Sequence, residues 1–223
     1  MTDENNTNEK FKQKQEEIIL KLMPTIRTNG FQTLRMDEIA KIVGISRATL
    51  YKYFPAKEDL FHRVTDGFVQ YIKEMTSNIP NEDTVFASKF QLIIEQSVSL
   101  ALFITDDFLN ELQSTYPLMY DKVWDIIQFR EQQLLIFYSE GMKNGVFNNI
   151  NGRLLILQDQ MLFSILDLKY LMKNQFSIEQ ALLDFYQLRK LQLFKPDKLS
   201  TVDDSLMMPR IEYLSQKISK VLY

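Results

Sequence analysis

The stretch GISRATLYKYFPAKEDL, Gly44–Leu60, decides the fold, because eight of its residues, Arg47–Phe54, hold two cations, a threonine and three aromatic side chains. The preceding segment MDEIAKIV, Met36–Val43, has the apolar spacing of a helix. Its inward face consists of Ile39, Ala40 and Val43. Gly44 permits a sharp reversal of the chain, and Ser46 is a good N-cap for a second helix. The pattern therefore predicts a helix-turn-helix.

The second helix has two faces of different chemistry. Its apolar residues are expected to pack on the first helix: Leu50, Phe54 and Tyr53. The other face carries side chains that reach bases and phosphates in a major groove: Arg47, Thr49, Tyr51 and Lys52. An ordinary helical hairpin with a solvated charged face is the alternative interpretation.

Charge is distributed unevenly along the chain. The 223 residues have a net charge of −3, yet Lys10–Arg63 holds eleven basic against six acidic residues, a net charge of +5. The remainder therefore carries −8. A basic module on an acidic body attracts phosphates locally, although a solvated charged face gives similar counts.

Helical spacing of apolar residues extends over nearly the whole chain, which has six glycines and six prolines. The predicted class is all-α. The expected helices are 11–28 (interrupted at Pro24), 36–43, 47–54, 57–75, 84–104, 106–115, 118–143, 152–173, 177–194 and 203–221. Residues 1–9 have the composition of a disordered lead-in. The turn-rich SNIPNED segment predicts a domain boundary near 77–83, with a DNA-binding domain at 10–78 and an effector-binding and dimerisation domain at 79–223.

The segment MDEIAKIVGISRATLYKYFPAKEDLF resembles the DNA-binding region of the TetR (tetracycline-repressor) family of bacterial transcription regulators. The resemblance covers about Ile18–Phe61, and SEGMKNGVFNNIN, Ser139–Asn151, resembles a loop that precedes the dimer helices in that family. It implies a three-helix DNA-binding domain followed by a larger helical domain that binds a ligand and dimerises.

The resemblance also implies roles for particular residues. Arg47, Ala48 and Thr49 would occupy the base-reading turn, with the cap Ser46 beside them, while Tyr51 and Lys52 would approach phosphates and adjacent bases. Lys57 would contact phosphate from the start of the next helix. Three positions depart from the family pattern: Arg35 and Ala56 replace the usual Ser or Thr caps, and Pro24 interrupts the first helix. Arg35 is a further candidate phosphate contact.

An enzyme is not expected. The chain has one histidine, no cysteine and no glycine-rich phosphate loop, so we predict no catalytic residues, no metal and no cofactor. His62 fits a surface or interhelix hydrogen bond better than catalysis. No apolar run approaches the ~18 residues of a membrane span and the N-terminus lacks a signal peptide, so we expect a soluble, cytoplasmic protein without a membrane partner.

An effector pocket is predicted within residues 86–138, where aromatic side chains alternate with isolated polar groups. The candidate lining is Phe90, Gln91, Glu95, Phe103, Tyr120, Trp124, Gln128 and Glu131. The same aromatic residues could simply form a core. Gly67, in the middle of the 57–75 helix, either allows close packing or provides a bend.

A homodimer is predicted from the helix at 152–173, which has two apolar faces and so needs two neighbours. The face assigned to the partner subunit contains Leu155, Leu162, Leu166 and Tyr170. Together these features predict a ligand-responsive repressor that releases double-stranded operator DNA on binding a small apolar or amphipathic effector. The alternative is a helical DNA-binding or scaffold protein that is regulated by a protein partner and has no small-molecule pocket.

Overall fold

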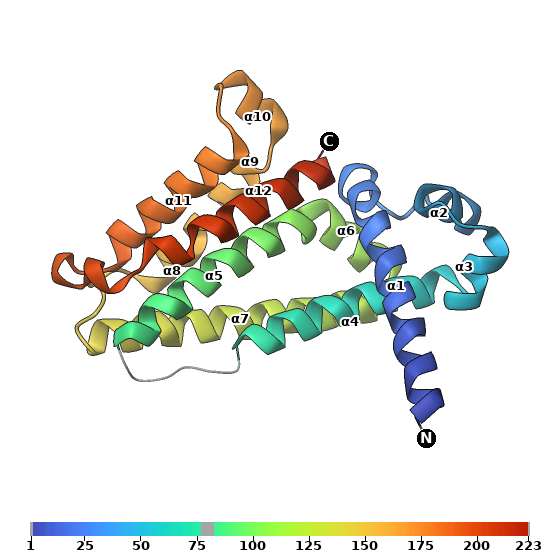
Figure 1. Ribbon diagram of the computed structural model, residues 1–223, viewed down its shortest axis with the longest axis horizontal. Helices are drawn as coiled ribbons and strands as arrows, with labels where there is room; N and C mark the ends of the chain where they lie inside the picture. The colour runs from blue at the N-terminus through green and yellow to red at the C-terminus, as the bar shows by residue number, and fades with distance from the viewer. Residues whose placement is uncertain (1, 77–82, 223) are drawn as a thin grey trace. The chain divides into compact units, whose positions relative to one another are not determined.

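The computed structural model describes residues 2–76 and 83–222, and in these segments it contains helices and no strand, which confirms the all-α class (Figure 1). The α-helices are α1 (Thr2–Asn29), α2 (Met36–Val43), α3 (Arg47–Tyr53), α4 (Lys57–Thr76), α5 (Asp83–Phe103), α6 (Asp106–Thr115), α7 (Pro117–Lys143), α8 (Gly152–Gln158), α9 (Met161–Ile165), α10 (Leu168–Lys173), α11 (Ile178–Leu193) and α12 (Met208–Leu222). Two 3-10 helices, η1 (Pro196–Thr201) and η2 (Asp204–Leu206), precede α12.

The chain forms two compact units. The first, unit 1, contains residues up to Gln70 together with 105–124, and unit 2 contains 71–104 and the residues from Asp125 onward. The predicted boundary at 77–83 lies almost wholly outside the described residues. The structure divides the chain instead at Gln70, within α4, and groups α6 with the N-terminal helices.

Helix α1 differs from its prediction at both the start and the middle. It begins at Thr2, so residues 2–9 are helical rather than a disordered lead-in. The helix continues through Pro24, two residues before the buried Ile26.

The core of unit 1 is a cluster of aromatic rings drawn from distant parts of the sequence. Phe31 lies 4.1 Å from Phe61 and 5.7 Å from Phe108, measured between ring centroids. Phe108 also meets the edge of Phe68 at 5.7 Å, and Tyr116 stacks on Phe31 at 6.2 Å. These contacts explain why 105–124 joins unit 1.

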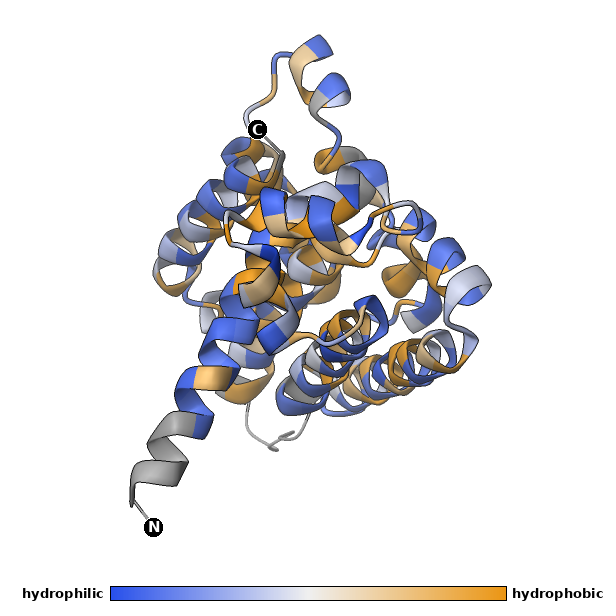
Figure 2. Ribbon diagram, turned by 90° about the vertical axis from the view of Figure 1, so that its right-hand side faces the viewer, coloured by the Kyte–Doolittle hydropathy of each residue, from blue (hydrophilic) through white to orange (hydrophobic). Residues whose placement is uncertain are grey.

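Unit 2 is built from amphipathic helices whose hydrophobic sides face one another. Helix α12 lies against α11 and α5 (Figure 1), and hydrophobic and hydrophilic residues alternate along the ribbons (Figure 2). Phe147 forms edge contacts with Phe137 at 5.2 Å and with Phe194 at 4.9 Å. Within the described ranges, no helix is long and apolar enough to cross a membrane.

The predicted helix at 152–173 is three helices, α8, α9 and α10. Asp159 follows α8 and accepts a hydrogen bond from Ser97 Oγ at 2.8 Å. Asp167 precedes α10 and accepts from the Lys169 N–H at 2.9 Å, which makes it an N-cap. Asp167 thus caps a new helix inside a segment whose apolar periodicity indicates continuity.

Candidate functional site

The turn between α2 and α3 depends on the left-handed backbone of Gly44, which has φ 74° and ψ 36°. In this conformation the Gly44 N–H donates to the carbonyl of Lys41 at 3.2 Å, and the Ile45 N–H donates to that of Ala40 at 3.0 Å. Both bonds satisfy carbonyls at the end of α2. A Cβ added at Gly44 would meet no other described residue within 4 Å apart from its chain neighbours, so the requirement for glycine is conformational.

Ser46 begins α3 as its N-cap, as predicted from the sequence. Its Oγ accepts a hydrogen bond from the Thr49 N–H at 3.0 Å and lies 2.7 Å from Thr49 Oγ1. Both hydroxyls therefore hold the first turn of α3 in place. A DNA contact by Ser46 or Thr49 would have to share these groups.

Beneath α3, the apolar residues pack as expected. The structure buries Ile39, Ala40, Val43, Leu50 and Phe54. Tyr53 is half-buried, with its ring centroid 4.9 Å from that of Phe11, and its carbonyl accepts from Gln15 Nε2 at 2.9 Å. The orientation of α3 is thus fixed from below by α1 and α2.

The opposite face of α3 is open to solvent. Arg47, Ala48, Tyr51 and Lys52 are exposed, and Thr49 is half-buried. Lys52 Nζ lies 5.8 Å from the centroid of the Tyr53 ring, a cation–π distance that leaves the ammonium at the surface. The structure thereby brings together on one exposed face the donors selected from the sequence, with a length suited to a major groove.

Arg35 and Lys57, the two candidate phosphate contacts outside α3, lie in different environments. Arg35 is the exposed N-cap of α2, and its N–H donates to Glu38 Oε2 at 2.8 Å. Lys57 is half-buried and its Nζ donates to the Gln32 carbonyl at 2.8 Å. Burial lowers the pKa of Lys57, while the negative charges of Glu111 and Glu38 oppose the shift.

Glu111, on α6, organises the turn that Lys57 reaches, and sequence reasoning missed this role. Its Oε2 accepts from the N–H groups of Phe31 at 2.5 Å and Gln32 at 3.1 Å. A Cβ at Gly30, where φ is +72°, would overlap the same carboxylate. Eighty residues separate Glu111 from Phe31. No local pattern could reveal such a contact, and in the sequence Glu111 fits an ordinary acid near a helix start.

The residues predicted to line an effector pocket are dispersed in the structure. In unit 1, Tyr120 stacks on Trp124 with 6.0 Å between centroids. In unit 2, three polar members have partners: Glu95 pairs with Arg210 at 3.1 Å, Glu131 with Arg153 at 3.0 Å, and Gln91 donates to Tyr186 and to the Asp203 carbonyl. Phe90 is buried, Lys217 lies over the ring of Phe103, and Gln128 is half-buried.

A pocket is present in unit 2, on other faces of α5 and α7. Its empty space of about 260 Å³ includes open solvent, and the enclosed part has room for about one water molecule. Its lining consists of Lys89, Ile93, Gln96, Arg130, Gln133, Leu134 and Phe137, none of which is in the predicted set. Aromatic content guided that prediction, whereas charged and amide groups supply much of this lining.

The structure corrects the predicted dimer face. Leu155, Leu162 and Leu166 are buried in the core of unit 2, so they cannot contact a partner there, while Tyr170 is exposed. The opposite apolar face of this segment is exposed instead, and it carries Leu154, Leu157, Met161 and Met172. The existence of two faces follows from periodicity, but periodicity does not say which face the subunit itself covers.

Comparison with known proteins places these features in a family. Residues 24–64 match the model of bacterial regulatory proteins of the tetR family. Two Bacillus subtilis (strain 168) proteins named as uncharacterized HTH-type transcriptional regulators are similar: YhgD, 25% identical over 52% of this chain and 61% of its own length, and YvaF, 24% identical over 74% and 87%. The chain thus spans less than two thirds of YhgD.

The fold extends the similarity beyond the matched segment. The ketosteroid transcriptional regulator KstR2 of Mycobacterium tuberculosis superposes with a TM-score of 0.57 over 82% of this chain and 95% of its own, at 14% identity. These relatives are transcriptional regulators rather than enzymes. Residues 24–64 are thus a helix-turn-helix segment of the tetR family of bacterial regulatory proteins, within a chain whose all-helical fold matches that of a transcriptional regulator.

Proposed function

We propose that the protein is a homodimeric repressor that binds operator DNA through the exposed face of α3 and releases it when a small molecule binds in unit 2. The observation that carries this proposal is the construction of α3. Its inner residues are buried, its first turn is capped by Ser46, and its outer face presents Arg47, Tyr51 and Lys52 to solvent. A rigid helix with exposed cationic and hydrogen-bonding side chains suits the major groove.

Dimerisation is supported by exposed apolar side chains on α8–α11. Besides the stripe from Leu154 to Met172, Leu188 and Leu191 of α11 are 47% and 60% exposed. Large exposed apolar surfaces of this kind mark interfaces. Two copies joined through this surface would present two α3 helices to successive major grooves about 34 Å apart.

Response to a small molecule is supported by the pocket in unit 2, which combines the apolar side chains Ile93, Leu134 and Phe137 with polar groups. Such a combination is typical of ligand sites, where a few polar groups orient a mostly apolar ligand. The pocket belongs to the same compact unit as the exposed apolar surface of α8–α11.

Selection of genomic fragments by the purified protein tests this proposal. We expect recovery of a fragment with two half-sites in inverted orientation, separated by about one helical turn of DNA. Footprinting should show protection centred on both half-sites. Recovery of fragments without any common inverted sequence would contradict the proposal.

A further inference from the structure

In unit 2, Arg130 of α7 is held by two side chains of α5. Its Nε donates to Gln96 Oε1 at 2.8 Å, and its Nη2 donates to Ser97 Oγ at 2.6 Å. Ser97 Oγ donates in turn to Asp159 Oδ2 at 2.8 Å. The guanidinium is therefore fixed in direction at the wall of the pocket, which it lines together with Gln96.

Gln96 has a polar group without a partner. The donor Arg130 Nε can bond only to the carbonyl oxygen of the Gln96 amide, so the NH₂ group must occupy the other position. Gln96 is 3% exposed, and within the described part of the chain no acceptor lies in hydrogen-bond range of its Nε2. A buried donor left unpaired costs about 1–3 kcal/mol. An acceptor brought by a ligand would remove this cost.

The charges around Arg130 are also unbalanced. A second guanidinium, that of Arg189, is buried and lies 3.5 Å from Asp159, the same carboxylate that Ser97 links to Arg130. Tyr138 bonds to Arg189, and burial raises the pKa of its phenol to about 12, so it is neutral and supplies no negative charge. One half-buried and one buried guanidinium thus share one carboxylate. The cluster therefore has one negative charge fewer than positive charges, and a bound monoanion would balance it.

The pocket next to this cluster combines polar groups with apolar walls. Its other walls are Ile93, Leu134 and Phe137, with Lys89 and Gln133 as further polar groups. The enclosed part of the pocket has room for about one water-sized group, and the remaining space is open to solvent. A carboxylate oxygen would occupy the enclosed part, and the hydrocarbon part of the ligand would lie in the open part.

We propose that the effector is a small apolar carboxylate whose head group binds to Arg130 and to the Nε2 of Gln96, with its hydrocarbon part against Leu134 and Phe137. This inference rests on the proposed function, because it identifies the ligand class of the site in unit 2. A carboxylate fits better than a phosphate ester, since the cluster lacks one negative charge, which a monoanion supplies. Guanidinium groups also bind carboxylates in a bidentate geometry.

Calorimetric titration of the full-length protein with three probes of equal chain length tests the head group. The probes are octanoate, 1-octanol and octyl phosphate. Octanoate should bind at least tenfold more tightly than 1-octanol and more tightly than octyl phosphate. Equal affinity for octanoate and octanol would overturn the proposal, and so would a preference for octyl phosphate or an absence of binding by octanoate.

Substitution of Gln96 by Glu tests the residues. The new carboxylate would pair with Arg130 and remove both the unpaired donor and the missing charge. Octanoate affinity should fall at least tenfold while octanol affinity is unchanged. Gln128→Glu makes the same charge change on α7 at a residue that does not line the pocket, and it should bind octanoate as the wild type does. Gln96→Met removes the donor without adding charge, and it replaces the first variant if Gln96→Glu does not fold.

Operator binding is measured separately on the same preparations, so the two claims can fail independently. If the protein binds its operator but Gln96→Glu binds octanoate as well as wild type, the pocket assignment is wrong and the regulatory proposal stands. If octanoate binds as predicted but no genomic fragment is bound, the proposed function is wrong and the anion site stands.

Discussion

Arg47 has the most specific expected role of any single residue. Its exposed guanidinium lies in the first turn of α3, where a bidentate contact to guanine is possible. Arg47→Ala should weaken operator binding by about 1–3 kcal/mol and relax the preference for one base pair. Fluorescence titrations with the operator and with single-base variants measure both effects. Lys143→Ala, an exposed cation in unit 2, is the control. Equal losses in the two variants would contradict a base-reading role.

Gly30 and Gly67 form a matched pair that separates two effects of glycine. Gly30 has φ +72° and its added Cβ would overlap the Glu111 carboxylate, whereas a Cβ added at Gly67 would meet no atom of the described residues within 4 Å outside its own helix backbone. Gly30→Ala should reduce the free energy of unfolding by more than the ~1–2 kcal/mol of a left-handed residue. Gly67→Ala should raise it by about 0.5–1 kcal/mol, through helix propensity. Urea unfolding measures the change in the free energy of unfolding for both variants. Destabilisation by Gly67→Ala would contradict the absence of packing contacts at Gly67.

The surroundings of Gly67 decide between the two reasons that the sequence offered for a glycine there. Close packing was one of the two predicted reasons for a glycine there, and the open space around it excludes that reason. A bend remains as an untested hypothesis, in a helix that is continuous from Lys57 to Thr76.

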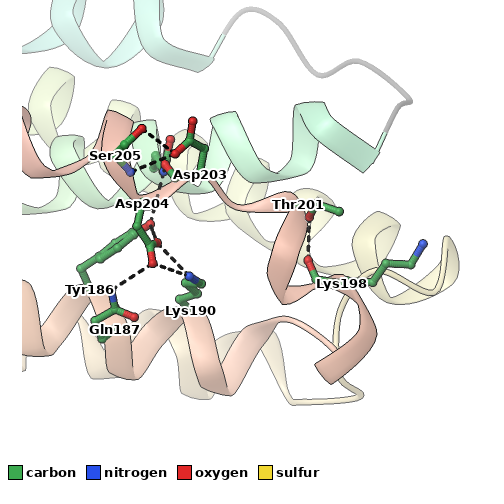
Figure 3. A network of polar contacts seen from close by, with 9 residues as sticks. Tyr186, Gln187, Lys190, Lys198, Thr201, Asp203, Asp204 and Ser205 are labelled. Atoms are coloured by element: carbon green, nitrogen blue, oxygen red, sulfur yellow. Dashed lines mark hydrogen bonds and ion pairs between the residues drawn. The ribbon is translucent and has the colours of Figure 1, made fainter.

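At the level of elements, a network of polar side chains joins α11 to η2 (Figure 3). Asp204 Oδ1 accepts from Tyr186 OH at 2.7 Å, and Lys190 Nζ lies 2.8 and 2.7 Å from the two carboxylate oxygens. Burial raises the pKa of Asp204, but the hydrogen bonds from Lys190 and Tyr186 outweigh it, and the pKa falls below its ordinary value of 3.8.

The sign of this shift predicts a pH dependence. A carboxylate with a depressed pKa in the folded state stabilises the protein above its unfolded pKa, and the contribution disappears as pH falls through the folded pKa. Wild type should therefore be more stable than Asp204→Asn at pH 7, and the difference should close below about pH 4. Urea unfolding from pH 7 to 3 measures the difference, which should shrink in a Lys190→Met background. A difference independent of pH would show that the charge of Asp204 does not contribute.

The elements also show what sequence can and cannot predict. The helices α2 and α3 follow from local signals, since Gly44, the Ser46 cap and the apolar face all lie within twenty residues. The break after α8 does not follow from local signals, because Asp159 is paired with Ser97, 62 residues away. The same limit applies to the site: the exposed face of α3 could be predicted, while the roles of Glu111 and Arg130 depend on partners from distant helices.

For the whole molecule, the corrected interface predicts the oligomeric state. Leu188→Glu together with Leu191→Glu would place two carboxylates on the exposed apolar surface of α11, and their desolvation on association should produce monomers. Sedimentation velocity measures the change. Leu118→Glu, at an exposed leucine of unit 1, should leave the dimer intact. If the double variant still dimerises, the interface lies on another surface.

Binding of operator DNA through the basic segment Lys10–Arg63 of an acidic chain is the central claim, and the salt dependence of that binding tests it most directly. The logarithm of the association constant should fall linearly with the logarithm of salt concentration, with a slope that reflects several phosphate contacts at about −0.9 per contact. Lys52→Ala should reduce this slope by about 1 on every sequence tested. An affinity for the selected operator that does not change with salt, or a Lys52→Ala slope equal to that of the wild type, would contradict the account.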